Sequence, residues 1–192
     1  MTIAENEVLD ALRDAGAILH GHFQLTSGRH SDTYVQCARV LEDPALTTSL
    51  ARAMAESVAE RGVDVVAAPA VGGIIIGFAV AQALGVRFIF TERQNGTMTF
   101  RRGFTVQPGE RVLVVEDVVT TGGSVAEVID LVRESGGDVV AVTSIIDRGG
   151  EKAFDAEFQP LLRLQVESME PQECPQCGQG TPIDSPGSRR LG

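Results

Sequence analysis

The chain has 192 residues, of which 43% are hydrophobic and 22% are charged, a composition typical of one globular domain and not of a disordered chain. Its 16 Lys and Arg residues against 26 Asp and Glu residues give a net charge of −10, which argues against binding to nucleic acid or to an anionic membrane surface. Three cysteines are too few for a disulfide framework, so we expect a reducing compartment, the cytoplasm.

The hydrophobic pattern predicts helices that alternate with strands along the chain. The acid-rich N-terminus lacks the pattern of a signal peptide. Residues 17–36 contain turn signals, and we expect them to be irregular with short extended pieces. The expected helices are 5–15, 44–61, 74–84 and 125–134, and the expected strands are 63–69, 86–92, 111–117 and 138–147. Strands separated by helices indicate a parallel α/β sheet with right-handed connections.

Residues 65–86 carry no charged side chain and are long enough to pass for a membrane span. Pro69, Gly72, Gly73 and Gly77 interrupt the segment, and charged residues bound it closely. We therefore expect a buried strand, a turn and a helix packed on a sheet, because buried parallel strands are continuously apolar.

The most informative motif lies between the strand at 111–117 and the helix at 125–134. The strand ends in Glu116 and Asp117, and the sequence Thr-Thr-Gly-Gly-Ser occupies residues 120–124. Small residues at the start of a helix let backbone N–H groups converge on a phosphate, and two carboxylates can accept hydrogen bonds from sugar hydroxyls. The pattern predicts a ribose 5-phosphate site, with a surface strand exit and a capped helix as the alternative from the motif alone.

These residues resemble the phosphoribosyl pyrophosphate (PRPP) signature of type I phosphoribosyltransferases. Other segments resemble the orotate phosphoribosyltransferase family: HFQLTSGRHSDTYVQC its N-terminal hood, APAVGG its pyrophosphate loop, SIIDRG its strand-end arginine, and CPxC…PGSR the tail of a short-loop bacterial and archaeal branch. The resemblance implies an α/β fold with a central, mainly parallel sheet flanked by helices and a small hood. It also implies one domain over 1–192, with a hood from about 1–40 plus the C-terminal segment, a core from about 41–167 and an irregular tail at 168–192.

The resemblance assigns roles to particular residues. Glu116 and Asp117 would bind the ribose hydroxyls, with Asp117 also catalytic. The 5-phosphate loop would comprise Val118, Val119, Thr120, Thr121, Gly122, Gly123 and Ser124. The orotate contacts would be Thr120, Arg148, Tyr34 and Val35, and the pyrophosphate loop Ala70, Val71, Gly72 and Gly73. A surface salt bridge is the alternative role for Arg148, and packing within the hood is the alternative for Tyr34.

The sequence departs from the common family pattern at the catalytic loop. Residues 93–103 form a short loop without Lys or His, and Gly72 occupies a position where many relatives carry Lys. The loop cations are Arg93, Arg101 and Arg102, of which we expect Arg93 to be catalytic; a solvated loop is the alternative for each. The resemblance also implies a homodimer in which this loop reaches the neighbouring active site.

The activity implied is transfer of the 5-phosphoribosyl group from PRPP to orotate, giving orotidine 5′-monophosphate and pyrophosphate in pyrimidine (UMP) biosynthesis. Mg²⁺ would be held mainly by PRPP and water, without direct protein ligands. Two alternatives remain: a purine-type phosphoribosyltransferase, and a non-catalytic regulator that retains the PRPP fold.

Histidines and cysteines outside this motif are candidate metal ligands. His20, His22 and His30 lie in the hood segment, where packing or solvation is the favoured interpretation. Cys174 and Cys177 supply half of a zinc site, and two ligands do not close a tetrahedron. Pairing of two tails across a twofold axis, a disulfide, and free thiols all remain open for these cysteines.

Overall fold

The structure, a computed structural model, describes residues 3–25, 27–150 and 153–186. Its helices are α1 (Glu5–Asp14), α2 (Ala38–Leu41), α3 (Pro44–Ser57), α4 (Gly72–Leu84), α5 (Gly123–Glu134) and α6 (Pro175–Gly178), with 3₁₀ turns η1 (Ala59–Arg61) and η3 (Pro171–Glu173). Its strands are β1 (Ile18–Gln24), β2 (His30–Val35), β3 (Val65–Pro69), β4 (Arg87–Gln94), β5 (Thr97–Phe100), β6 (Arg111–Val119), β7 (Asp138–Asp147) and β8 (Phe158–Arg163).

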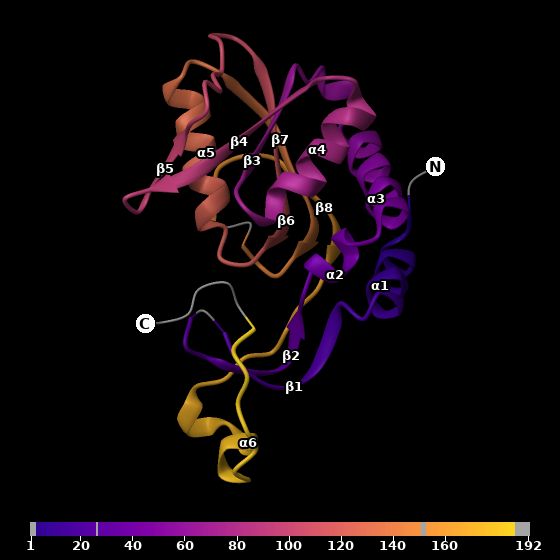
Figure 1. The fold of residues 1–192 in the computed structure, drawn as a ribbon, viewed down its shortest axis with the longest axis vertical. Coiled ribbons are helices and arrows are strands. Elements are labelled where there is room, and N and C mark those ends of the chain that lie inside the picture. Colours follow the sequence, from indigo (N-terminus) through magenta and orange to yellow (C-terminus); the bar gives the residue numbers. More distant parts are fainter. Residues whose placement is uncertain (1–2, 26, 151–152, 187–192) are drawn as a thin grey trace.

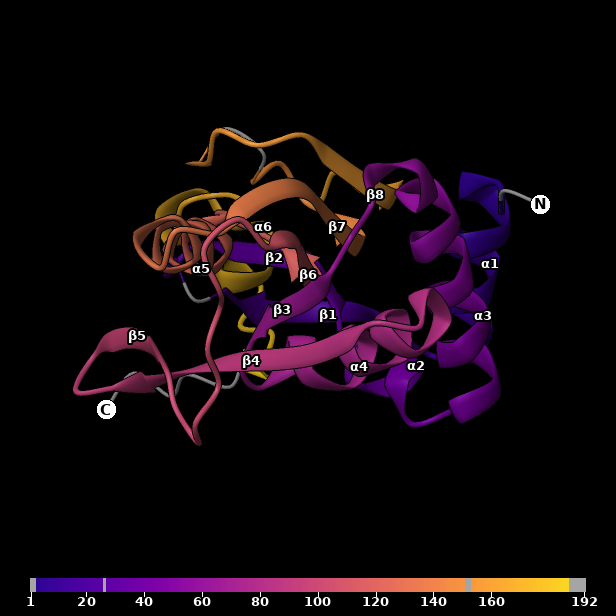
Figure 2. The same cartoon turned by 90° about the horizontal axis from the view of Figure 1, so that it is seen from above.

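Six strands form the central sheet in the order β5-β4-β3-β6-β7-β8. All neighbouring pairs are parallel except β4 and β5, which are antiparallel. Helices α1 to α4 lie on one side of this sheet and α5 lies on the other (Figure 2). The predicted α/β class with a mainly parallel sheet between helices is confirmed.

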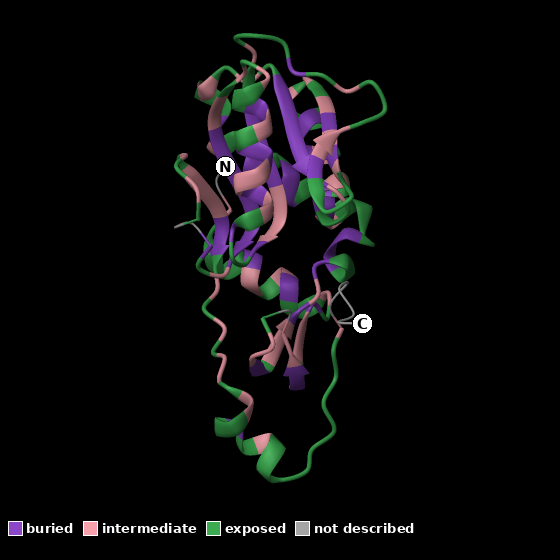
Figure 3. Ribbon diagram, turned by 90° about the vertical axis from the view of Figure 1, so that its left-hand side faces the viewer, coloured by how far each residue is buried: buried purple, intermediate pink, exposed green. Residues whose placement is uncertain are grey.

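Alternate residues of the central strands fill two separate cores. On β6, Leu113 and Val115 pack in the core with α1, α3 and α4, whereas Val112 and Val114 pack in the core with α5. Because successive side chains of a strand point to opposite faces, a strand covered on both faces must be apolar throughout. This explains the uncharged runs in the sequence and the buried centre of the molecule (Figure 3).

Local sequence signals set the ends of the helices. The Asp43 carboxylate accepts hydrogen bonds from the backbone N–H groups of Ala45 and Leu46 at the start of α3, with Pro44 at the first helical position. The expected helix 44–61 is divided into α3 and η1, and Gly62 follows with φ 60°. Among the described residues, no helix is long and apolar enough to cross a bilayer.

A separate two-stranded antiparallel sheet, β1 with β2, forms the hood at one end of the core (Figure 1). The C-terminal segment pairs with both of its strands. His30 and Met169 exchange two backbone hydrogen bonds of 2.9 Å, and Asp184 pairs with the backbone of His22 and Gln24 on the other strand. The hood therefore contains residues from both ends of the chain.

The structure differs from the expected elements in several further places, one of them the short helix α2. Within the segment expected to be irregular, Ile18–Gln24 and His30–Val35 form the regular pair β1 and β2, and β8 was not expected. The expected polar loop at 93–102 is a hairpin of β4 and β5, closed by Asn95 (φ 53°) and Gly96 (φ 84°). Positive φ at both central residues is typical of a two-residue hairpin turn. Within the described part of the expected irregular tail, 168–186, η3 and α6 form short helical turns; residues 187–192 lie outside the described residues.

Candidate functional site

Three loops emerge together at the carboxyl edge of the central sheet. They follow β3, β6 and β7, which are parallel neighbours in the sheet. In open parallel sheets, this edge is where ligands bind. The hood faces the same end of the core, so these loops lie between the two sheets (Figure 1).

The loop after β6 surrounds a small cavity at the start of α5. The cavity is lined by Glu116, Val118, Val119, Thr120, Thr121, Gly122, Gly123, Ser124 and Val125. Gly122 has φ 75° and caps α5, so the first free N–H groups of that helix open toward the loop. Helix N-termini favour anions because of these N–H groups and the helix dipole. The structure thus brings the sequence-predicted phosphate loop together around one hollow.

Glu116 and Asp117 end the buried part of β6 side by side. Glu116 Oε1 accepts a hydrogen bond of 3.1 Å from the Asp117 N–H, and Asp117 Oδ1 accepts one of 2.7 Å from the Val118 N–H. Burial raises the pKa of the Glu116 carboxyl well above its usual range, and the adjacent charge of Asp117 raises it further. Burial also raises the pKa of Asp117. Donors from a sugar would relieve this desolvation.

The loop after β3, predicted to bind pyrophosphate, lies directly against these acids. A Cβ at Gly72 would lie 2.7 Å from Asp117 Oδ1, and a Cβ at Gly73 would lie 3.2 Å from Glu116 Oε1 and 3.1 Å from the Val115 carbonyl oxygen. The peptide bond Ala70–Val71 is cis. A Cβ at position 72 would force the Asp117 side chain to move, and one at position 73 would crowd its neighbours, so glycine allows this close approach.

Asp147 holds the turn of the loop after β7, a role that was not predicted from the sequence. Asp147 is 4% exposed, and its Oδ1 accepts hydrogen bonds from the N–H groups of Gly149 (2.8 Å) and Gly150 (3.1 Å). A Cβ at Gly122 would lie 2.3 Å from the Gly150 carbonyl oxygen. The available signal was an acidic residue at the end of an apolar strand, directly before Arg148.

Arg148 follows Asp147, and its backbone N–H donates to the Val119 carbonyl oxygen at 2.8 Å. Its Nε is buried and has no hydrogen-bond partner among the described residues. Burial lowers the pKa of this guanidinium, while the nearby Tyr34 hydroxyl acts in the opposite direction. The structure shows no ion pair for Arg148 within the described ranges, in contrast to the surface salt bridge considered as the alternative.

Tyr34 on β2 brings the hood to the core loops. Burial raises the pKa of its phenol; the positive charge of Arg148 opposes this shift and the negative charge of Asp117 adds to it. Its ring also packs against Phe23, with centroids 5.7 Å apart. Tyr34 therefore packs in the hood and faces the core site at once, while Val35 is buried at 6% exposure.

The arginines of the hairpin are already engaged within the chain. Arg93 Nη1 and Nη2 donate to the two carboxylate oxygens of Glu127 on α5, at 2.8 and 2.6 Å. Arg102 forms a similar two-bond pair with Glu92, at 2.8 and 2.9 Å, and Arg101 acts on the same carboxylate electrostatically. Glu127, not anticipated from the sequence, thus holds Arg93 beside the helix that follows the phosphate loop.

Comparison with known proteins agrees with this architecture. The Phosphoribosyl transferase domain family matches residues 37–159. An orotate phosphoribosyltransferase of Desulforamulus reducens is 50% identical over 186 residues, covering 96% of this chain and 97% of that protein. One of Heliobacterium modesticaldum is 52% identical, covering 97% of this chain and all of that protein.

Solved structures give the same result. Orotate phosphoribosyltransferase from Aeropyrum pernix superimposes with a TM-score of 0.71 at 27% identity, over 82% of this chain and 93% of that chain. Adenine phosphoribosyltransferase from Rhodothermus marinus superimposes with a TM-score of 0.69 at 22% identity, over 83% of this chain and 99% of that chain, which shows the shared fold alone.

The fold, the phosphate loop and the family match define the class: the protein is a phosphoribosyltransferase. The sequence comparison is more specific, because the chain is 50% and 52% identical to two orotate phosphoribosyltransferases over nearly its whole length. The chain belongs to the orotate phosphoribosyltransferase family.

Proposed function

We propose that the protein transfers the 5-phosphoribosyl group of PRPP to orotate, yielding orotidine 5′-monophosphate and pyrophosphate in UMP biosynthesis. Family membership supports the reaction. The choice of orotate as the base rests on one observation: the Nε atom of Arg148 is buried and has no hydrogen-bond partner among the described residues. Arg148 lies at the carboxyl edge of the sheet and interacts electrostatically with Tyr34. A planar guanidinium fork matches a carboxylate or a pair of ring oxygens, and the other site loops supply no comparable buried cation.

PRPP would occupy the edge of β6. The loop at 118–124 would hold the 5-phosphate through backbone N–H groups and hydroxyls, and Glu116 and Asp117 would accept hydrogen bonds from the ribose 2- and 3-hydroxyls. Residues 70–73 would lie under the pyrophosphate, because Gly72 places this loop against Asp117. Binding at both ends of the ribose fixes its C1 atom between the loops.

The transfer requires no nucleophilic side chain. The bond between ribose C1 and the pyrophosphate oxygen breaks, and pyrophosphate leaves with the electron pair. A ring nitrogen of orotate forms the new bond to C1 and loses its proton to water. The chain contributes by orienting the two reactants and by stabilising the charge that develops, and such positioning supplies large rate factors.

Magnesium fits this site as a partner of the substrate. Glu116 and Asp117 are hard oxygen donors of the kind Mg²⁺ prefers, but in the described part of the chain no third His, Cys, Asp or Glu joins them in a cluster of metal ligands. They would hold the ion through sugar hydroxyls and water. When bound, Mg²⁺ would neutralise negative charge on the diphosphate.

A homodimer is part of the proposal. Helix α4 begins after Val71, and the side chains of Val71, Ile75 and Phe78 are 82%, 52% and 60% exposed. Their spacing forms an apolar stripe on one helix face, which a second copy of the chain would cover. The projecting hairpin of β4 and β5 would then bring Arg93 to the neighbouring site (Figure 2).

We place the enzyme in the cytoplasm, which suits its free thiols.

Incubation with PRPP, Mg²⁺ and a panel of bases, followed by mass analysis, tests the proposed reaction. Orotate should give orotidine 5′-monophosphate, whereas adenine, guanine and hypoxanthine should give no nucleotide. Asp117→Asn should lower turnover about 10- to 100-fold, since a hydrogen bond to a charged group contributes about 1.5–3 kcal/mol. A purine nucleotide as the main product would support a purine-type phosphoribosyltransferase instead. The absence of any nucleotide product would support a non-catalytic regulator.

A further inference from the structure

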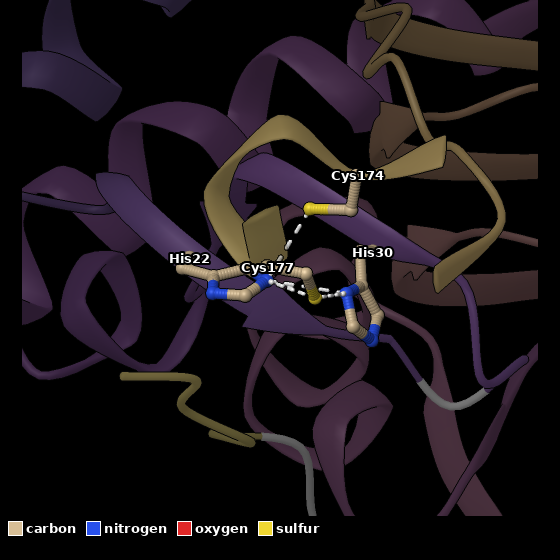
Figure 4. Close-up of side chains that lie close together, drawn as sticks. All are labelled: His22, His30, Cys174 and Cys177. Atoms are coloured by element: carbon tan, nitrogen blue, oxygen red, sulfur yellow. Dashed lines mark hydrogen bonds between the residues drawn. The ribbon is translucent and has the colours of Figure 1, made fainter. Parts of the chain in front are cut away.

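Four potential metal ligands converge in the hood, away from the site described above. They are His22 on β1, His30 on β2, Cys174 and Cys177, and their ligand atoms all lie within 4.8 Å of one another (Figure 4). His22, His30 and Cys174 are buried, at 4%, 6% and 7% exposure. No other group of three or more His, Cys, Asp or Glu residues with this geometry occurs in the part of the chain that the structure describes.

Four of the distances within this cluster are close to those of a tetrahedron of mixed nitrogen and sulfur ligands. Nε2 of His22 lies 3.1 Å from Nδ1 of His30, 3.4 Å from Sγ of Cys174 and 3.6 Å from Sγ of Cys177. Nδ1 of His30 lies 3.3 Å from Sγ of Cys177. Zinc–nitrogen bonds of about 2.0–2.1 Å and zinc–sulfur bonds of about 2.3 Å at tetrahedral angles separate such atoms by about 3.3–3.8 Å.

The orientation of His22 has an independent support. Its Nδ1 lies 2.9 Å from the carbonyl oxygen of Thr181, so this nitrogen carries the proton and donates it to the backbone. The lone pair is then on Nε2, the atom that faces His30 and both cysteines. Histidines that bind metals characteristically donate their other N–H in this way, which fixes the tautomer and the ring orientation.

A local irregularity of β1 aims His22 into the cluster. The register of β1 against β2 shifts between His20 and Phe23, so the simple alternation of side chains is broken there. His22 is buried as a result, whereas His20 remains exposed and approaches Thr33. His20 and His22 therefore have different environments although they are two positions apart on β1.

We propose that His22, His30, Cys174 and Cys177 bind one Zn²⁺ ion in a closed structural site. Binding would release the two thiol protons, and two thiolates with two neutral imidazoles would balance the ionic charge at a largely buried position. Four protein ligands leave no open coordination position, so the ion is structural and takes no part in group transfer. The proposal does not depend on the substrate of the enzyme.

The site would join segments that are distant in sequence. His22 and His30 come from the two strands of the hood, and the cysteines come from α6 and the residue before it, about 150 positions later. Figure 3 shows that the C-terminal segment extends beyond the core as a mostly exposed loop. Its sequence contains few apolar residues to hold it. Bonds from a metal ion to its protein ligands can stabilise the fold of such a unit when its hydrophobic core is small.

The test is the metal content of wild-type protein and matched single variants. Protein expressed with zinc and purified under reducing conditions should contain about one zinc per chain, as expected for one closed site. His22→Ala and Cys177→Ala should lose most of it. His20→Ala, which removes a histidine two positions away on the same strand, should retain it. Equal loss in His20→Ala and His22→Ala, or retention in Cys177→Ala, would overturn the assignment.

A second measurement needs no variant. Cobalt(II) added to metal-free wild-type protein should produce the absorption bands of tetrahedral cobalt with thiolate ligands, and zinc should displace them. Zinc should protect Cys174 and Cys177 from thiol reagents, and a chelator should lower the thermal midpoint. No zinc and no thiolate–cobalt absorption would refute the site. An intact mass lighter by two hydrogen atoms in zinc-bearing medium would show a disulfide between Cys174 and Cys177 in its place.

Discussion

Gly72 and Asp117 are in such close approach that a Cβ on the glycine would lie 2.7 Å from one carboxylate oxygen and 2.8 Å from the other. The carboxylate has little freedom to move away, because its Oδ1 accepts a hydrogen bond from the Val118 N–H at 2.7 Å. Gly72, which has no side chain, thus occupies the position where the family resemblance implies Lys in many relatives. In this chain, the absence of a side chain at Gly72 allows the loop after β3 to contact the Asp117 carboxylate.

Gly72→Ala should therefore damage catalysis more than folding. Displacing the Asp117 carboxylate by about 1 Å should lower kcat/KM about 100-fold, the scale expected for misplacing a positioning group. Steady-state kinetics measures the effect, and circular dichroism reports the fold. Gly178→Ala is the matched control, because a Cβ there would have no neighbour within 4 Å. If both variants were equally active, the close approach would have no catalytic consequence.

The acid pair predicts a proton-linked binding step. Burial raises the pKa of both Glu116 and Asp117, so one or both carboxyls hold a proton at a pH where a solvated carboxyl is ionised. Hydroxyl donors from PRPP stabilise the ionised forms and lower these pKa values. Binding of PRPP with Mg²⁺ should therefore release protons, and affinity should rise with pH through the raised pKa of the pair.

Calorimetry in buffers of different ionisation enthalpy measures this proton release. Glu116→Gln should reduce it, because the more strongly shifted carboxyl is gone. The same raised pKa values mean that the folded state binds more protons than the unfolded state, so the pair destabilises the ligand-free protein as pH rises through this range. Glu116→Gln should accordingly raise the thermal midpoint near neutral pH and have little effect at acidic pH. Proton uptake on PRPP binding would contradict the prediction.

We predict that Arg148 determines the preference for orotate. Orotate differs from uracil by a carboxylate, and the chain has a net charge of −10, so selecting the anion requires a local positive group. Losing a buried charge-assisted hydrogen bond costs about 2–5 kcal/mol, so Arg148→Ala should lower kcat/KM for orotate roughly 30-fold or more. Binding of PRPP with Mg²⁺ should change little by calorimetry, because Arg148 follows β7 and the phosphate loop follows β6. Loss of PRPP affinity with unchanged orotate kinetics would move Arg148 to the pyrophosphate side.

The elements that sequence could predict are those with a local signal. The apolar runs of β3, β6 and β7 and the cap of α3 at Asp43 are visible in short windows, and so is the phosphate loop. The hairpin at Asn95 and Gly96 also had a local signal, an Asn-Gly pair between strand residues, which the polar composition of the segment obscured.

Other features depend on contacts between distant residues. β8 contains Pro160 and polar side chains, which an edge strand tolerates but a sequence pattern does not indicate as a strand. The cluster of His22 and His30 with two cysteines arises because the C-terminal segment returns to the hood and β1 changes register. Neither event leaves a pattern in the separate segments, so the sequence showed only half of a metal site.

The role of Arg93 can be tested by mixing two inactive variants. Its guanidinium makes two hydrogen bonds to Glu127 within the same chain, so reaching a neighbouring site requires this pair to open or to shift with the hairpin. If Arg93 acts across a homodimer, an Arg93→Ala subunit paired with an Asp117→Asn subunit contains one intact site. Random exchange of equal amounts should recover about a quarter of wild-type activity in a twofold-symmetric dimer.

Mixing Arg148→Ala with Asp117→Asn is the control, because both residues serve the same site from one chain and no intact site forms. Sedimentation verifies that the variants assemble. Activity that stays at the parental level in assembled Arg93→Ala and Asp117→Asn mixtures would place Arg93 at its own subunit's site or outside catalysis altogether.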